Sequence, residues 1–169
     1  DGVLEAIPRL WATRKIGYLL NQIRLNGPNQ ELIDQVVRLS IRFGIVTPYT
    51  SYLVTEETLL GAVEQERIVQ EQLEKMTTAT PAPSFGESAV QQAADTGAMA
   101  DASSASAPSV EAADVVRIVG ARTFVLSQGV WIDTAFDPDT MTAIPVSFLS
   151  ADYFDLVSAR DELADAFAL

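Results

Sequence analysis

The sequence predicts an α+β protein with N-terminal helices plus one strand, a flexible linker, and a C-terminal antiparallel β-meander with terminal helices. Two periodicities carry this prediction. Apolar side chains recur at helical spacing before residue 44, and they alternate with polar ones after residue 114. Residues 77–113 are rich in Ala, Ser, Thr and Pro and contain no Lys or Arg, which is typical of a disordered segment. We therefore expect a helical region at 1–76, a disordered linker at 77–113 and the meander with its helices at 114–169.

Three helices are expected before the linker. The first covers about residues 8–25, with a proline suited to its first turn and an Asn-Gly-Pro sequence after it. The second runs from an Asn29 cap to Phe43, and Gly44 is placed for a left-handed C-terminal cap. Its apolar residues cover more than one stripe, so it should be buried on two sides. The third helix, at about 56–76, is rich in charge and should be mostly solvated.

A strand is predicted at 45–54, "IVTPYTSYLV", because β-branched and aromatic residues dominate this stretch. Pro48 cannot donate a ladder hydrogen bond, which favours an edge position or a strand start. No other strand is predicted on this side of the linker, and unpaired backbone groups are costly when buried. We therefore expect pairing with the C-terminal meander, with a second copy of the chain, or with sequence outside this chain. The candidate interaction residues are Ile45, Val46, Tyr49, Tyr52 and Val54.

The region after the linker should form an antiparallel meander. A short hairpin loop is expected at 127–129 and a proline turn at 137–140. A helix capped by Ser150 follows, and a final helical turn or two closes the region. A unit this small buries only about 60% of its unfolded surface, so we expect it to lean on another surface. The four predicted strands lie at 114–120, 122–127, 130–136 and 143–149.

Composition excludes several kinds of chemistry. The chain contains neither Cys nor His, which removes thiol nucleophiles, disulfides, imidazole or thiolate zinc sites and histidine acid–base catalysis. The formal net charge is −12, with the excess of acid mostly in the C-terminal region. Because a negative surface repels phosphate and anionic lipid, we expect neither nucleic acid nor membrane as a partner. No apolar run approaches the roughly 20 residues of a membrane helix.

Two segments resemble a known family. "IPRLWATRKIGYLLNQIRLNG" and "ELIDQVVRLSIRFGIVTPYTSYLV", with the spacing between them, are similar to the segment after the von Willebrand A domain in inter-alpha-trypsin inhibitor heavy chains and their bacterial relatives, which carry a VIT domain before the A domain. The endings "VRIVGARTFVLSQGVWID" and "ADYFDLVSARDELADAFAL" also resemble bacterial members. The resemblance implies that residues 1–76 are the helical segment after an A domain and pack with VIT-side β-structure.

The resemblance implies no metal site in this chain. The metal-dependent adhesion motif of A domains reads Asp-x-Ser-x-Ser, and "DASSAS" at 101–106 matches it only in part, because Ala105 stands at the last serine position. The stretch also lies in the predicted linker, away from any buried strand. We therefore expect no cofactor from this motif.

Three carboxylates near the proline turn are candidate metal ligands. Asp133, Asp137 and Asp139 offer oxygen atoms at alternating spacing, which suits Ca²⁺. Ordinary turn chemistry is the simpler interpretation, because Asp side chains accept hydrogen bonds from nearby backbone amides. A paired-carboxylate hydrolase using Asp133 and Asp137 is a third interpretation, and it requires a cleft and a raised pKa. We expect turn chemistry, no cofactor and no enzyme activity.

Four aromatic residues form a further candidate surface. Trp11, Tyr49, Tyr52 and Trp131 are able to stack against a ligand, although such residues more often anchor a core or an interface. With the resemblance, the expectation is a non-enzymatic scaffold of a VIT/VWA-type protein, acting in protein interaction or cell adhesion and secreted or held at the cell surface. The expected partner is the VIT/VWA portion of the same polypeptide or a second copy of the chain. The alternative is a small ligand- or Ca²⁺-binding module that uses the acidic turn at 133–139.

Overall fold

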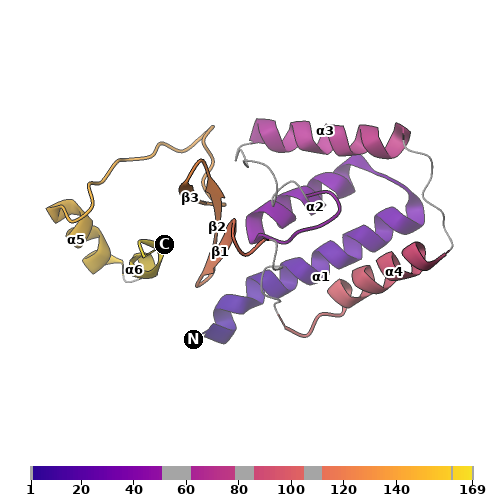
Figure 1. The fold of residues 1–169 in the computed structure, drawn as a ribbon, viewed down its shortest axis with the longest axis horizontal. Helices are drawn as coiled ribbons and strands as arrows, with labels where there is room; N and C mark the ends of the chain where they lie inside the picture. Colours follow the sequence, from indigo (N-terminus) through magenta and orange to yellow (C-terminus); the bar gives the residue numbers. More distant parts are fainter. Residues whose placement is uncertain (1, 51–61, 79–85, 105–111, 161, 169) are drawn as a thin grey trace.

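The computed structural model describes residues 2–50, 62–78, 86–104, 112–160 and 162–168. Within these ranges the chain has the predicted α+β fold. Four helices gather on one side of a three-stranded antiparallel sheet, and two short C-terminal helices lie on the other (Figure 1). The helices are α1 (Gly2–Asn26), α2 (Gln30–Phe43), α3 (Ala62–Thr78), α4 (Glu87–Ala100), α5 (Ala151–Ala159) and α6 (Glu162–Ala166), and the strands are β1 (Val116–Val119), β2 (Arg122–Ser127) and β3 (Val130–Asp133).

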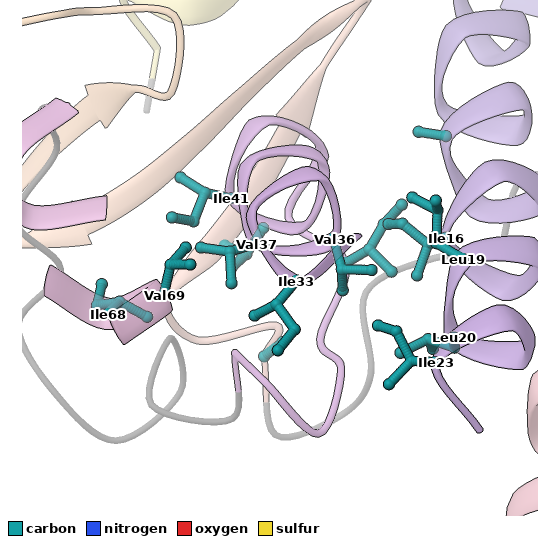
Figure 2. Packing of buried hydrophobic residues seen from close by; sticks show 14 of the residues in the cluster. Ile16, Leu19, Leu20, Ile23, Ile33, Val36, Val37, Ile41, Ile68 and Val69 are labelled. Carbon is teal, nitrogen blue, oxygen red and sulfur yellow. The ribbon is translucent and has the colours of Figure 1, made fainter. Parts of the chain in front are cut away.

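Helix α2 is buried on two sides, as its apolar pattern predicts. Helix α1 packs against one side and α3 against the other (Figure 2). The side chain of Asn29 accepts hydrogen bonds from the N–H groups of Glu31 (2.9 Å) and Leu32 (3.2 Å), which caps the helix start. The apolar side chains that form this three-helix layer are Ile33, Val36, Val37 and Ile41 of α2, Ile16, Leu19, Leu20 and Ile23 of α1, and Ile68 and Val69 of α3.

Helix α1 begins earlier than predicted. The sequence pattern places Pro8 in the first turn, whereas the structure starts the helix at Gly2 and has Pro8 inside it. Proline has no N–H, so the backbone bond that it omits is the one to the carbonyl of residue 4. This loss is confined to a single bond near the start of a long helix, and the rest of α1 is held by its packing against α2.

Residues 45–50 form a turn, which corrects the predicted strand over this stretch. The N–H of Thr50 donates to the carbonyl of Thr47 at 3.0 Å, with the Pro-Tyr pair at the centre of the turn. The Thr50 hydroxyl accepts from the Thr47 N–H at 3.0 Å and lies 2.9 Å from the Thr47 hydroxyl. These buried side chains satisfy backbone groups that a strand would pair in a ladder. Residues 51–54 of the predicted strand lie outside the described residues.

Helix α4 lies inside the region that the sequence predicts as a disordered linker, which is a second correction. It packs along α1, and the two helices approach closely at Gly17, where an added Cβ would lie 2.4 Å from the backbone nitrogen of Ala100. Alanine is the best helix former, and contact with α1 adds the burial that the composition of α4 does not promise. Parts of the predicted linker on both sides of α4 lie outside the described residues.

The sheet is a meander in the order β1-β2-β3. Gln128 and Gly129 connect β2 to β3 with φ values of 50° and 77°, the left-handed pair of a tight hairpin turn, which confirms the predicted loop. The fourth predicted strand is wrong: residues 143–149 contain no strand, and their side chains are exposed. Pro145 has no N–H for a ladder and Ile144 is 83% exposed, so neither pairing nor burial holds this segment against β3.

Helix α2 ends where the sheet approaches it. Gly44 has φ 59°, the predicted left-handed cap, and its N–H donates to the carbonyl of Ile41 at 3.2 Å. The N–H of Ile45 donates to the carbonyl of Ser40 at 2.9 Å. This pair of bonds is a Schellman motif, which needs a residue that tolerates positive φ at its centre.

The last two carbonyls of α2 receive hydrogen bonds from distant side chains. The Thr134 hydroxyl donates to the carbonyl of Arg42 at 2.8 Å, and the Arg9 guanidinium donates to the carbonyl of Phe43. Burial lowers the pKa of Arg9. Arg42 also lies 3.6 Å from the carboxylate of Asp133. The C-terminal end of α2 is therefore joined both to α1 and to the end of β3.

The chain beyond β3 leads away from the helices and ends in α5 and α6, which contact each other (Figure 1). The hydroxyl of Ser150 accepts from the N–H of Tyr153 at 3.2 Å, which confirms the predicted cap of α5.

Candidate interaction surfaces

The predicted interaction residues do not form an edge strand within the described part of residues 45–54. Ile45 is 8% exposed, and Val46 and Tyr49 pack half-buried against the helical core. Burial raises the pKa of the Tyr49 phenol. These three residues therefore stabilise the turn after α2. Tyr52 and Val54 lie outside the described residues.

The acidic turn is held by hydrogen bonds and by the ion pairs of Asp133 with Arg42 and Arg122. The carboxylate of Asp133 accepts from the Arg122 guanidinium at 2.7 Å and from the N–H two residues further on at 2.8 Å. The carboxylate of Asp137 accepts from the N–H of Asp139 at 3.0 Å and from the hydroxyl of Thr140 at 2.7 Å. These are the contacts of turn-forming aspartates. Within the described residues, no three Asp or Glu side chains gather in a way that would hold a metal ion.

The three described residues of the candidate stacking surface, Trp11, Tyr49 and Trp131, are not assembled. Trp11 lies on α1 and is 55% exposed. Trp131 lies on β3 under the guanidinium of Arg117, 5.1 Å from the ring centroid. Tyr49 belongs to the turn after α2, and Tyr52 lies outside the described residues. Among the described members of this set, Trp11 is the one whose side chain is more than half exposed.

Helix α1 has a second apolar face, opposite the one that packs on α2. It consists of Ile7, Trp11, Tyr18 and Leu25, which are 51%, 55%, 53% and 66% exposed. Their spacings of four, seven and seven residues place them along one side of the helix. We call these four residues the outer face of α1. A helix that is apolar on both sides is usually buried on both, so this face has the composition of a contact surface.

The outer face of α1 is positively charged along its edges. From Ile7 to Leu25 the helix has four basic residues and no acidic one. Helical geometry puts Arg14 and Lys15 on the two flanks of the outer face. The ammonium of Lys15 lies 5.5 Å from the centroid of the Tyr18 ring. This surface combines aromatic rings with cations.

A second exposed apolar group lies at the other end of the chain, in residues 148–168, which we call the acidic C-terminal segment. The ring of Tyr153 packs at centroid distances of 5.2 to 5.5 Å from the rings of Phe148, Phe154 and Phe167. These three phenylalanines are nevertheless 72%, 53% and 45% exposed. The segment has five acidic residues and one basic residue. It is an aromatic cluster on a negatively charged element.

A hollow of about 550 Å³ lies near the start of α2 and is a weaker candidate site. Three of its polar side chains are already engaged: Asn29 caps α2, and the guanidinium of Arg38 pairs with the carboxylate of Asp34 at 2.7 Å. The lining also includes Glu31 and Glu66, so the hollow is acidic on balance. Nothing in this arrangement selects a ligand.

Sequence reasoning missed the outer face of α1 because it considered the single face that builds the core. The signal was present in the spacing of Ile7, Trp11, Tyr18 and Leu25.

Among the described helices, none combines the length and the apolar character that crossing a membrane requires. Comparisons of the chain with family models, curated proteins and solved structures found no match.

Proposed function

We propose that this chain is a non-enzymatic interaction region of a VIT/VWA-type protein, supporting protein–protein interaction or adhesion at the cell exterior. One observation carries the proposal: two groups of large aromatic and apolar side chains are exposed, on the outer face of α1 and in the acidic C-terminal segment. Grouped apolar exposure marks interaction sites in soluble proteins, because a partner that covers such a patch removes apolar surface from water.

The placement of the family-like residues supports the VIT/VWA part of the proposal. The two segments that resemble the region after an A domain form α1, α2 and the turn at 45–50, which pack as one unit around a shared core. An interaction partner for this unit is the VIT/VWA portion of the same polypeptide or a second copy of the chain.

Calcium binding by the acidic turn is not proposed. Asp133 and Asp137 already accept hydrogen bonds from groups within the sheet and the turn. A structural role accounts for both residues.

The complete coding sequence tests the family part of the proposal. We expect it to encode a VIT domain and an A domain upstream of Asp1. A coding sequence without these domains would remove the assignment.

Binding tests the interaction part. The VIT/A portion, produced as a separate polypeptide, should bind this chain in a calorimetric titration. Trp11→Ala and Phe154→Ala should each weaken binding, since each removes an exposed ring from one of the two groups. Val63→Ala is the matched control, because Val63 is 75% exposed on α3 and belongs to neither group. A titration without heat change would exclude the VIT/VWA portion as the partner and leave the second copy, and equal affinity for all three variants would contradict the assignment of the two groups as interaction surfaces.

A further inference from the structure

We propose that the acidic C-terminal segment of one copy covers the outer face of α1 in a second copy, so that the chain forms a reciprocal dimer. This inference rests on the proposed interaction function and names its partner. It starts from the fact that one chain carries two exposed aromatic surfaces of opposite charge.

Charge is the first reason for matching these two surfaces. Arg14 and Lys15 flank the outer face of α1 and no acidic residue lies between Ile7 and Leu25, whereas residues 148–168 have five acidic residues and one basic residue. The Arg9 guanidinium is turned to the end of α2 and does not contribute to this face. Opposite potentials favour encounter and fix orientation, and like charges exclude wrong pairings. The acidic segment is therefore better suited to α1 than a second α1 face would be.

Chemistry at the centre of each surface is the second reason. The outer face of α1 presents Trp11 and Tyr18, and the C-terminal segment presents Phe154 and Phe167. Aromatic residues are enriched at the centres of protein interfaces, where their large apolar area is removed from water. Arg14 and Lys15 would then lie at the rim, beside aspartates of the segment.

Size is compatible with the contact. Trp11 and Tyr18 are seven residues apart, which is about 10 Å along a helix, and the nine residues of α5 span about 14 Å. Helix α5 is therefore long enough to contact both rings at once.

The path of the chain favours a second copy over the same one. In Figure 1 the connection after β3 leads away from α1–α4, and α5 and α6 lie on the far side of the sheet. Docking on another copy leaves this path unchanged. Each copy brings one basic and one acidic surface, so two contacts related by a two-fold axis satisfy both copies and close the assembly.

Charge reversal gives a sharp test. Arg14→Glu with Lys15→Glu makes the outer face of α1 acidic, and Asp152→Lys with Asp155→Lys makes α5 basic, because these are the only charged residues of that helix. We expect wild type to form a concentration-dependent dimer in sedimentation equilibrium. Each double variant alone should raise the dimer dissociation constant by about tenfold or more.

A mixture of the two double variants should form a heterodimer. In that pair the unchanged outer face of α1 in the α5 variant meets the unchanged acidic segment of the α1 variant. The acidic outer face of the α1 variant meets the basic α5 of the other chain. Contact within a single chain does not produce this rescue. The control is Arg67→Glu with Lys75→Glu on α3, which changes the net charge by the same amount as the α1 variant and should leave the dimer intact. Because it also removes the ion pairs of both residues with Glu71, its helix content must match that of wild type. Circular dichroism confirms that each variant is folded.

Three results would overturn the inference. The first is a wild-type chain that remains monomeric at high concentration, whether or not its C-terminal segment is protected from amide exchange. The second is a variant mixture without heterodimer. The third is a monomer that binds anionic phospholipid vesicles through Arg14 and Lys15, which would assign the outer face to a lipid surface. A monomer that still binds the VIT/A portion would refute the dimer and leave the proposed function standing.

Discussion

Replacing Gly44 with alanine tests the junction between α2 and the sheet. Gly44 has φ 59°, and a Cβ there would lie 2.5 Å from Cγ1 of Val116 and 2.9 Å from Cγ2 of Thr123. The left-handed backbone costs an L-residue about 1–2 kcal/mol. The contacts force a buried, β-branched side chain of the sheet to move, which adds about 1–3 kcal/mol of overpacking. Gly44→Ala should therefore lower the free energy of unfolding by about 2–5 kcal/mol.

Gly27 provides the matched control. It also follows a helix with positive φ, 87°, and nothing lies within 4 Å of the position of its Cβ. Gly27→Ala should show the backbone cost alone, about 1–2 kcal/mol. The assay is urea unfolding followed by circular dichroism, with the slope compared between variants to check that the transition is unchanged in kind.

A double variant separates the backbone cost of Gly44→Ala from the cost of its contact with Val116. Val116→Ala removes the nearer of the two clashing methyl groups, so combining it with Gly44→Ala should cost less than the sum of the two single changes. We expect a coupling of about 0.5 kcal/mol or more in that direction. If Gly44→Ala and Gly27→Ala destabilise equally and the coupling is absent, β1 does not pack on the end of α2 as described.

Two other predictions concern α4 and the turn at 45–50. Gly17→Ala should weaken the packing of α4 on α1 by about 1–3 kcal/mol, because the new Cβ meets backbone at Ala100. Gly97→Ala, which has open space around it, should stabilise α4 by about 0.5–1 kcal/mol. Amide exchange across α4 measures both effects. Because burial raises the pKa of Tyr49, its contribution to stability is present below the ordinary value of about 10 and is lost as the pH rises through the higher folded pKa. Between pH 9 and 11, roughly the range in which tyrosine titrates, the Tyr49→Phe variant should therefore lose less stability than the Tyr18→Phe variant, which retains Tyr49. Equal loss of stability in the two variants would contradict a buried Tyr49 phenol.

Local features of the fold could be predicted from the sequence because short-range chemistry decides them. Asn29 and Ser150 cap helices through amides within three residues of themselves. Gly44 ends α2 because positive φ costs glycine least. The Gln128-Gly129 loop follows from the tight turn that two antiparallel strands require. The wide apolar surface of α2 predicted its burial on two sides.

The candidate interaction surfaces could be predicted only in part from the sequence. The acidic charge of the C-terminal segment and the spacing of Ile7, Trp11, Tyr18 and Leu25 are both present in the sequence. Apolar spacing alone does not say which face of a helix meets the core. That choice required the position of α2, which buries the opposite side of α1.

Tertiary structure decided the elements whose local preferences are satisfied equally well by another conformation. Residues 45–50 have strand-forming side chains, but the Thr47 and Thr50 hydroxyls complete a buried turn. The end of α2 is held by Thr134, which lies 92 residues from Arg42 along the chain. Helix α4 has a composition suited to a linker, yet it forms a helix that packs along α1, with a close approach at Gly17. The turn combines local bonds between Thr47 and Thr50 with the packing of its apolar residues on the helical core. For the end of α2 and for α4 the deciding partner is remote in sequence. The energy of a remote contact cannot be read from neighbouring residues, because it exists only after the chain has brought the two surfaces together.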